Sequence, residues 1–280
     1  MNIKISAPFS WLRRCGMAAI LWVLLSSNGF AFDQDYVRYG AVLKEYVVAG
    51  RVNYAALQKN RGPIDHVIKE FSSVKPEEYQ KWSREQQIAY WINIYNGWFL
   101  QIVIDHYPIH ESRLIGFVFP KNSVQRISGI WDKIFLETPM GKVSLNDIEH
   151  KILRSQFKEP RIHFAIVCAS IGCPKLRSEP TLAASLDRDL DNSAAAFISD
   201  PSKVKLQPEI RRIELSSIFK WFAGDFAGFA DDDWKHLYSI EKAGPLAFIS
   251  RYLPAADSAY LKQRSVDVGY LPYDWTLNEQ

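Results

Sequence analysis

The chain has little cysteine: Cys15, Cys168 and Cys173 are the three among its 280 residues. A structural zinc site needs about four Cys or His ligands, and no second Cys/His pair with suitable spacing accompanies Cys168 and Cys173. The chain also lacks the C-x-x-C motif and the βαβ pattern of thioredoxin-like redox proteins. A G-x-S-x-G motif that would mark Ser170 as a nucleophile is missing too. We therefore predict no metal ion and no other cofactor.

Beyond its first residues the chain has no surplus of charge of either sign. The formal net charge of +3 comes from Lys4, Arg13 and Arg14, because residues 1–31 carry no Asp or Glu and the rest has 31 basic and 31 acidic side chains. The basic residues are scattered and form no dense tract interleaved with aromatics. We therefore predict no binding to nucleic acid and no general attraction to anionic membranes.

Residues 1–31 have the pattern of a secretory signal peptide. A basic stretch precedes an apolar run from Gly16 to Leu25, and the small residues Gly29 and Ala31 occupy the positions that a signal peptidase reads. The run is too short for a comfortable membrane span. We predict cleavage after Ala31, a periplasmic or secreted mature protein, and no stable membrane span once the signal has been removed.

No repeat, low-complexity tract or Gly/Ser linker divides residues 32–280, and nearly half of the chain is apolar. A chain of this size can bury the core of one large domain. The order of the predicted elements indicates an α+β fold, a helix-rich single domain around a small mixed or antiparallel sheet. The main elements are a helix over 84–107 capped by Ser83, a β-hairpin over 132–145, a helix over 145–157 capped by Ser144 and Asp147, a buried strand over 162–168, and helices over 185–198, 216–226 and 239–252.

Three polar residues lie on or near the apolar face of the helix over 84–107. At about 100° per residue, Glu85 and Asn96 fall at the edge of this face and Asn93 a little further round. A buried carboxylate or amide must be hydrogen-bonded, or it costs a few kcal/mol. Two interpretations stay open: these side chains tie neighbouring segments to the helix, or they line a pocket. With Ser170 they are our candidate binding residues.

The helix over 145–157 places Glu149 on its apolar face, with His150 beside it at the boundary. A glutamate there is unusual, and a buried Glu next to a His can yield a general base, because each shifts the pKa of the other. The alternative is that Glu149 binds the backbone of a loop and His150 lies at the surface. His163 falls on the predicted strand, where a lone histidine is more often a core residue than a catalyst.

Cys168 and Cys173 allow a structural disulfide. Export would remove Cys15 and leave two thiols in an oxidising compartment. The four residues between them can curl back enough to bring the two Cα atoms within bridging range. Closing so small a loop would stabilise the fold by about 2 kcal/mol.

Cys168 is also a candidate nucleophile, because small residues follow it and their backbone N–H groups could form an oxyanion site. His150 or His163 would then be the base, and Glu149 or Asn96 would orient it. Thiol peptidases usually place the cysteine at the start of a helix and the histidine later in a sheet. The order here differs, so any likeness to thiol peptidases would be distant.

Five segments, AYWINIYN, SLNDIEHKILR, PRIHFAIVCASIGCPKLR, FKWFAGDF and YLPYDWTLN, together resemble the family known as domain of unknown function 547. The resemblance runs from about Tyr36 to Asn278 and implies one compact domain. The family has no settled activity, so the resemblance implies no catalytic role. The residues that fall at the family's motif positions are Asn93, Asn96, Glu149, His150, His163, Cys168, Asp274 and Trp275.

Two functions follow from these patterns, and the sequence leaves open whether the protein is an enzyme. The first is a thiol-dependent hydrolase or acyltransferase acting on peptide or amide bonds, with Cys168 as nucleophile. The second is a non-catalytic module with a Cys168–Cys173 disulfide that binds a small molecule, a peptide or an envelope protein. It would use a polar pocket where 84–107, 145–157 and 162–168 meet, or the aromatic residues of WFAGDF and YLPYDW.

Overall fold

The computed structural model describes residue 1 and residues 31–109 and 119–280. Residues Phe32–Gln280 form a compact unit of their own. The predicted signal peptide lies outside the described residues from position 2 to position 30, and its cleavage stays a prediction. In the described part of the chain, no helix is long and apolar enough to cross a membrane.

Helix α5, Arg84–His106, is the central helix of the N-terminal half. It begins with a capping box, in which the Ser83 side chain accepts from the Gln86 N–H and the Gln86 side chain accepts from the Ser83 N–H. Almost every residue from Ile88 to Ile104 is buried, because the helix is apolar around most of its circumference. The predicted helix over 84–107 is thus confirmed.

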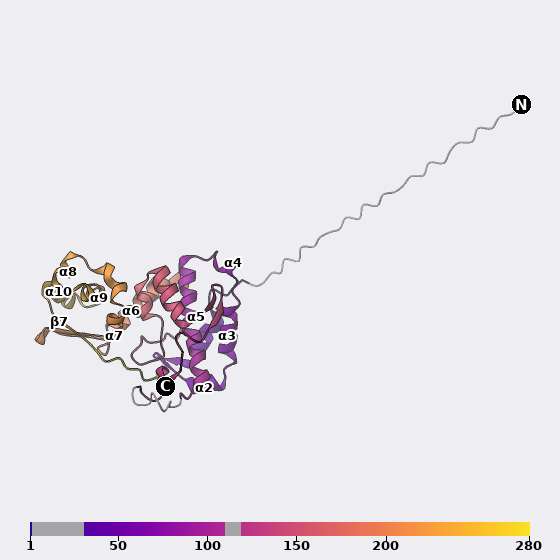
Figure 1. The fold of residues 1–280 in the computed structure, drawn as a ribbon, viewed down its shortest axis with the longest axis horizontal. Coiled ribbons are helices and arrows are strands. Elements are labelled where there is room, and N and C mark those ends of the chain that lie inside the picture. Colours follow the sequence, from indigo (N-terminus) through magenta and orange to yellow (C-terminus); the bar gives the residue numbers. More distant parts are fainter. Residues whose placement is uncertain (2–30, 110–118) are drawn as a thin grey trace. The chain divides into compact units, whose positions relative to one another are not determined.

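The remaining N-terminal helices surround α5. Helices α2 and α3 pack directly on it, and α1 packs on α2 and α3 (Figure 1). The bounds are Val37–Tyr46 for α1, Tyr54–Lys59 for α2, Gly62–Ser72 for α3 and Pro76–Tyr79 for α4, and a short 3-10 helix η1 covers Val124–Arg126.

The described residues contain small sheets of two or three strands. Strands β1 and β2 pair antiparallel, as do β3 and β4, which form the predicted hairpin around Pro139 and Met140. In the third sheet, β6 pairs antiparallel with β5 and parallel with β7. The fold is therefore a helix-rich α+β domain with a small mixed sheet, as predicted. The strands are Val47–Val48, Arg51–Val52, Leu136–Thr138, Gly141–Val143, Val204–Gln207, Arg212–Leu215 and Asp267–Tyr270, from β1 to β7.

The C-terminal half adds a second group of helices. Helix α9 packs against α8, α10 and the 3-10 helix η6 (Figure 1). The helices predicted over 185–198 and 239–252 are confirmed, whereas the one predicted over 216–226 is divided at Phe222 into α7 and η6. The bounds are Leu186–Ile198 for α6, Ser217–Trp221 for α7, Asp232–Leu237 for α8, Ile240–Ser250 for α9, Ala255–Gln263 for α10, and Ala183–Ser185, Pro208–Ile210 and Ala223–Phe229 for η4, η5 and η6.

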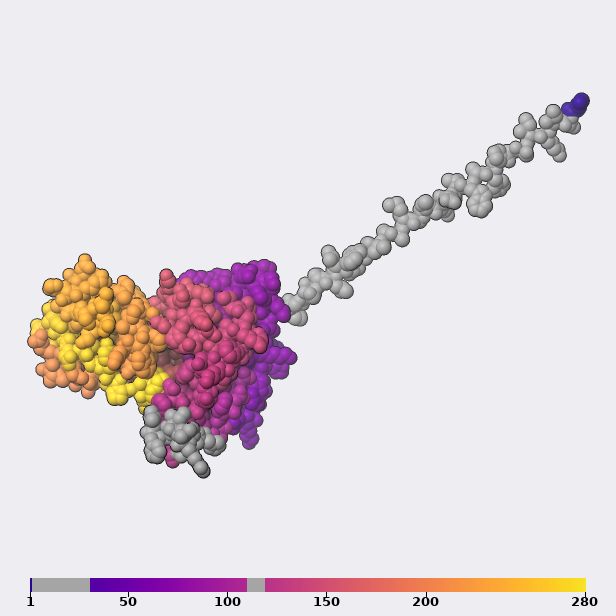
Figure 2. All heavy atoms as spheres, in the orientation of Figure 1, coloured from indigo at the N-terminus to yellow at the C-terminus, as the bar shows by residue number. Residues whose placement is uncertain are grey.

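The buried side chains form two hydrophobic clusters. The first includes the apolar residues of α1 to α5 and of the first part of α6, and the second those of the last part of α6, of α7 to α10 and of the sheet β5–β6–β7. Figure 2 shows the orange and yellow C-terminal residues beside the magenta residues from the middle of the chain. Tyr273 packs against both clusters, so the C-terminal segment helps to join them.

The predicted strand over 162–168 is wrong. Pro160–Phe164 form a 3-10 helix, η3, and a turn follows it. Ile162 belongs to the first hydrophobic cluster and Phe164 to the second. The apolar run therefore serves two cores at once, instead of being buried on both faces of a sheet. A short apolar run does not distinguish a buried strand from a buried helical turn.

The helix predicted over 145–157 is present as a π-helix, η2, over Asp147–Phe157. The Ser144 hydroxyl accepts from the Asp147 N–H at 3.1 Å, and the Asp147 carboxylate accepts from the Ser144 N–H at 2.9 Å, which confirms the predicted cap. In a π-helix the hydrogen bonds join residues five apart, a geometry that often occurs at functional sites.

Candidate functional site

A cavity of about 300 Å³ lies where side chains of both hydrophobic clusters meet. Its polar lining includes Glu149 and His150 from η2 and His163 from η3, and Cys168 lies on the same wall. We call it the aromatic cavity, because six of its lining residues carry aromatic rings: Tyr95, Trp131, Trp221, Phe222, Tyr273 and Trp275.

Three of these rings pack on one another at the mouth formed by α7 and the C-terminal segment. The ring centroids of Tyr273 and Trp275 are 4.5 Å apart, and that of Trp221 lies 4.8 Å from Tyr273. Trp221 is 49% exposed. A large aromatic side chain left half in water beside a cavity is typical of a binding surface.

Glu149 is a weakly hydrogen-bonded carboxyl in the lining of the aromatic cavity. Among the described residues its carboxyl has one hydrogen-bonding partner, the Tyr95 hydroxyl, at a long 3.5 Å. Burial raises the pKa of Glu149 from 4.5 to about 7, although the positive charge of Arg154 acts in the opposite direction. The carboxyl therefore changes its charge close to neutral pH, which suits acid–base chemistry or the binding of a charged ligand.

His163 and Arg154 hold the carboxylate of Asp225 between them. His163 Nε2 lies 2.7 Å from Asp225 Oδ2, and the Arg154 guanidinium donates to both carboxylate oxygens, at 2.6 and 2.8 Å. Burial raises the pKa of Asp225, but these hydrogen bonds outweigh it and hold the pKa well below its usual range. Asp225 is thus ionised, and it fixes the His163 proton on Nε2.

The ring of Phe222 contacts both His163 and Arg154 of this network. The His163 ring stacks on Phe222 with centroids 3.9 Å apart, and Arg154 lies over the same Phe222 ring at 4.8 Å. Burial lowers the pKa of His163 despite its contact with Asp225. The histidine is held rigidly by packing on one side and by a carboxylate on the other.

His150 is also neutral near pH 7. Its Nδ1 lies 2.8 Å from Arg154 Nη1, and since a guanidinium can only donate, Nδ1 must accept and cannot carry a proton. Burial lowers the pKa of His150, and the charge of Arg154 lowers it further. The charged groups beside the cavity are therefore Arg154, Asp225 and, once ionised, Glu149. Arg154 forms its ion pair with Asp225, so its positive charge, which also acts on Glu149, is shared with a second carboxylate.

Cys168 and Cys173 form a disulfide, so Cys168 carries no free thiol in this state. The polar neighbours of its sulfur are the hydroxyls of Ser170 and Tyr273, at 3.3 and 3.2 Å. The bridged segment is fixed to the C-terminal segment, because Ile171 and Gly172 donate to carbonyls of Thr276 and Asp274, both at 2.8 Å.

A glycine is required within the bridged segment. A Cβ on Gly172 would lie 2.8 Å from the ring of Tyr273, closer than real contacts allow. The absence of a side chain lets the Tyr273 ring, which lines the aromatic cavity, approach the disulfide.

The comparison with known protein families gives a match to the part of the chain that supplies the polar residues of the aromatic cavity. Residues 79–198 match the family described as Protein of unknown function, DUF547. We call residues 79–198, which are similar to this family, the DUF547 region. The predicted resemblance is confirmed there, over part of the chain and not from Tyr36 to Asn278. No curated protein and no solved structure matches the chain.

The DUF547 region supplies Glu149, His150, His163 and both cysteines, whereas Asp225 and the aromatic residues of the mouth lie beyond it. The structure thus brings all four predicted catalytic side chains, Cys168 included, to one cavity. WFAGDF and YLPYDW, which the sequence offered as a separate binding surface, each contribute two aromatic residues to the same cavity. The two predicted sites are one site.

The candidate binding residues have a different place. Asn93 donates to the Thr181 carbonyl at 2.7 Å and accepts from its N–H at 2.9 Å. Asn96 donates to the Ala165 carbonyl at 2.9 Å and accepts from the Val167 N–H at 2.8 Å. Both asparagines are buried and tie loops to α5, as the first of the two interpretations held.

The prediction that Glu85 lies at the edge of the buried face of α5 is wrong. Glu85 is exposed and lies in the first turn of α5, before the buried stretch begins at Ile88. Ser170 is buried next to the disulfide, and its hydroxyl donates to Tyr273 at 3.2 Å. Neither residue lines the aromatic cavity.

Some residues of the site carry no sequence signal. Arg154 and Asp225 are separated by 71 residues and meet only in the fold. The one hint is that Asp225 stands alone among aromatic and small residues in WFAGDF. Within residues 31–109 and 119–280, no group of three or more His, Cys, Asp or Glu side chains is arranged to hold a metal ion.

Proposed function

We propose that the protein is an exported binding protein that takes a small organic cation into the aromatic cavity. The observation that carries this proposal is the state of Glu149: a desolvated carboxyl with one long hydrogen bond and, among the described residues, no ion pair, at a wall of six aromatic residues. Aromatic faces attract cations, and a quaternary ammonium bound in an aromatic cage needs no hydrogen-bond acceptor.

The dimensions and the charge of the cavity support the same class of ligand. Its volume of about 300 Å³ is at the lower end of the range of small-molecule sites, roughly 300–1,000 Å³. Since Arg154 forms its ion pair with Asp225, a bound cation would supply the direct ion pair that Glu149 does not form with the described residues. An anion would be repelled by the ionised Glu149.

The test is a titration with benzyltrimethylammonium, which is permanently charged, and with benzyl alcohol, its neutral counterpart. Tryptophan fluorescence reports on binding because three tryptophans line the cavity. We expect the cation to bind at least about tenfold more tightly than the alcohol. Binding of the cation should strengthen from pH 5.5 to pH 8, since Glu149 ionises in this range.

The substitution Glu149→Gln removes the charge and nearly preserves the shape, so it should abolish both the preference for the cation and its pH dependence. Glu137→Gln is the matched control, because Glu137 is an exposed carboxylate in β3 away from the cavity. Equal affinities for the cation and the alcohol in the unmodified protein would overturn the proposal.

Export is part of the proposal and rests on the pattern of residues 1–31 and on the disulfide, a bond that persists in oxidising compartments. Cell fractionation should place the protein in the periplasm or the medium, with Phe32 as its first residue. Recovery from the cytoplasm with residues 1–31 still attached would contradict export.

A thiol-dependent hydrolase or acyltransferase is the second candidate, favoured because Cys168, His150, His163 and Glu149 line one cavity. It would operate only after a thiol reductant has opened the disulfide. The Cys168 thiolate could then attack an ester or amide carbonyl and form a thioester, while the alcohol or amine leaves with a proton from His150 or His163. Water would then cleave the thioester, releasing the acid and the Cys168 thiol. Cys173→Ser frees Cys168 without a reductant. Incubation of this variant with p-nitrophenyl acetate should give an acetyl group on Cys168, detected by mass spectrometry. Absence of the acetyl group would exclude this candidate.

A further inference from the structure

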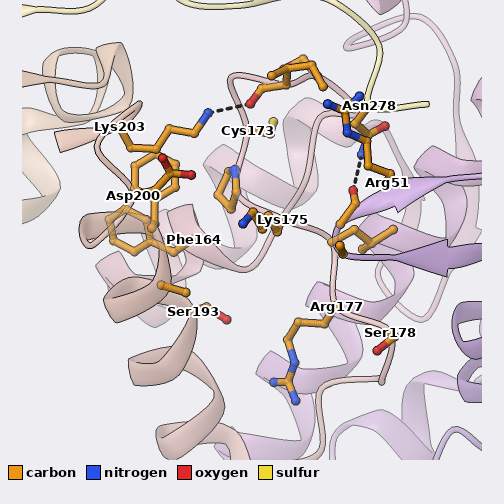
Figure 3. A pocket seen from close by; sticks show the side chains of 18 of the residues that line it. Arg51, Phe164, Cys173, Lys175, Arg177, Ser178, Ser193, Asp200, Lys203 and Asn278 are labelled. Atoms are coloured by element: carbon orange, nitrogen blue, oxygen red, sulfur yellow. Dashed lines mark hydrogen bonds between the residues drawn. The ribbon is translucent and has the colours of Figure 1, made fainter. Parts of the chain in front are cut away.

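The segment that carries the disulfide also borders a second cavity, of about 560 Å³. Cys173 and Pro174 line both cavities, so this segment is the wall between them. Four basic residues line the second cavity: Arg51, Lys175, Arg177 and Lys203. We call it the basic cavity, and Figure 3 looks into it, with Lys203 and Arg177 toward opposite ends of the view and Lys175 between them.

The two arginines of the basic cavity already have partners. Arg177 forms an ion pair with Asp189, at 3.1 Å. Arg51 donates to the backbone carbonyl of Glu279 at 3.2 Å and lies at the exposed edge. The arginines therefore contribute less to the unsatisfied charge of the cavity than the lysines do.

The two lysines of the basic cavity, unlike Arg177, form no ion pair with a described carboxylate. Lys203 is 9% exposed, and its ammonium donates to the Ile171 carbonyl at 2.6 Å, which uses one of its three N–H groups. Among the described residues, neither Lys203 nor Lys175 has a carboxylate oxygen within 4.0 Å. A buried ammonium without a paired anion is costly.

The lysines also act on each other. Burial lowers the pKa of Lys203, the charges of Asp200 and Asp274 act in the opposite direction, and the charge of Lys175 lowers it further. A negative group between the two ammonium ions would reduce both the repulsion and the cost of desolvation. The cavity thus has a place for one anionic group.

The other lining groups narrow the class of ligand. Glu179 and Asp200 also border the cavity and would repel a polyanion. Asn192, Ser193 and Ser202 add amide and hydroxyl groups to the lining, which suit a ligand with several hydroxyls. We propose that the basic cavity binds a small hydroxylated organic acid, with its carboxylate between Lys175 and Lys203.

The experiment is calorimetric titration of the purified protein with D-glucuronate, and with D-glucose as its uncharged counterpart. Glucuronate should bind at least about tenfold more tightly than glucose, as expected when a charged group gains hydrogen bonds. Its affinity should fall as salt is added. Inorganic phosphate, titrated separately, tests whether any anion suffices.

Three variants locate the site. Lys203→Met and Lys175→Met keep most of the side-chain stem and should each weaken glucuronate binding by about tenfold or more. Lys205→Met is the matched control, since Lys205 is exposed and lies two residues along β5 from Lys203. Lys175 is exposed, so its variant should fold even if Lys203→Met does not.

Three results of these titrations would contradict the proposed binding of a hydroxylated acid. Equal affinities for glucuronate and glucose, an equal loss in Lys205→Met and Lys175→Met, or binding of phosphate without binding of glucuronate would each overturn the proposal. Because the basic cavity lacks Glu149, glucuronate binding should be unchanged in Glu149→Gln. The proposal therefore stands or falls independently of the organic cation.

Discussion

Glu149 carries a charge where its surroundings disfavour one, and this makes the stability of the fold depend on pH. Burial raises its pKa from 4.5 to about 7 in the folded protein. Between these two pH values the folded state keeps a proton that the unfolded chain releases. By linkage, the favourable contribution of the protonated carboxyl is fully present below about pH 4.5 and is lost as the pH rises through 7.

Replacing Glu149 with Gln should therefore stabilise the protein at pH 8 and leave its stability nearly unchanged at pH 4. We expect a gain on the order of 2 kcal/mol at pH 8, since one pKa unit corresponds to about 1.4 kcal/mol. Urea unfolding at the two pH values measures it, with Glu137→Gln as control for the loss of a surface charge. A variant that is less stable than the parent at pH 8 would show that the ionised carboxylate is well solvated or paired.

The sequence alone identified Glu149 and His150 as unusual residues, but it did not identify the residues that surround them in the fold. Glu149 and His150 could be singled out because a helical pattern says which positions should be apolar. Nothing in such a pattern indicates that Arg154 turns toward Asp225, 71 residues away, and thereby neutralises it. The charge balance that makes Glu149 distinctive is a property of contacts between distant segments.

Elements fixed by local chemistry were predicted well. Helix α5 and the cap of η2 follow from Ser83, Gln86, Ser144 and Asp147, residues that act within three positions of one another. The conformation of residues 162–168 was predicted wrongly because it depends on the hydrophobic clusters that pack against them. Ile162 belongs to one hydrophobic cluster and Phe164 to the other. A short apolar run in the sequence does not show whether it forms a buried strand or a helical turn between two clusters.

The loop that follows η3 is held by a single side chain of α5, which gives a test at the level of the element. Asn96→Ala leaves the Ala165 carbonyl and the Val167 N–H without their partner, at a cost of about 2–4 kcal/mol. Ile166 and Cys168 of the same loop line the aromatic cavity. The variant should therefore also bind benzyltrimethylammonium more weakly, in the fluorescence titration at a temperature where it is folded.

Asn93→Ala is the matched variant, because Asn93 makes the same two kinds of hydrogen bond to Thr181, and Thr181 does not line the aromatic cavity. It should lose a similar free energy of unfolding, measured with urea, and keep its affinity for the cation. Equal losses of affinity in both variants would mean that the loop after η3 does not shape the aromatic cavity.

The whole molecule is organised around one shared wall. The aromatic cavity draws its lining from α5, η1, η2, η3, α7 and the C-terminal segment, and the basic cavity draws on β2, η3, α6 and the residues around Lys203. Among the described residues, Cys173 and Pro174 are the ones that line both cavities. No sequence pattern could predict this, since a cavity assembled from six segments exists only after the two hydrophobic clusters have met.

The disulfide should therefore matter to both cavities at once. Replacing both Cys168 and Cys173 with Ser removes a short closed loop, which should cost about 2 kcal/mol of stability in the chain-entropy model. Because Cys173 lines both cavities, the double variant should bind benzyltrimethylammonium and glucuronate more weakly, whereas Glu149→Gln and Lys175→Met each affect one ligand. Reduction of the unmodified protein with dithiothreitol should reproduce the double variant. Unchanged affinities for both ligands after reduction would show that the hydrogen bonds of Ile171 and Gly172 to the C-terminal segment hold the wall in place without the disulfide.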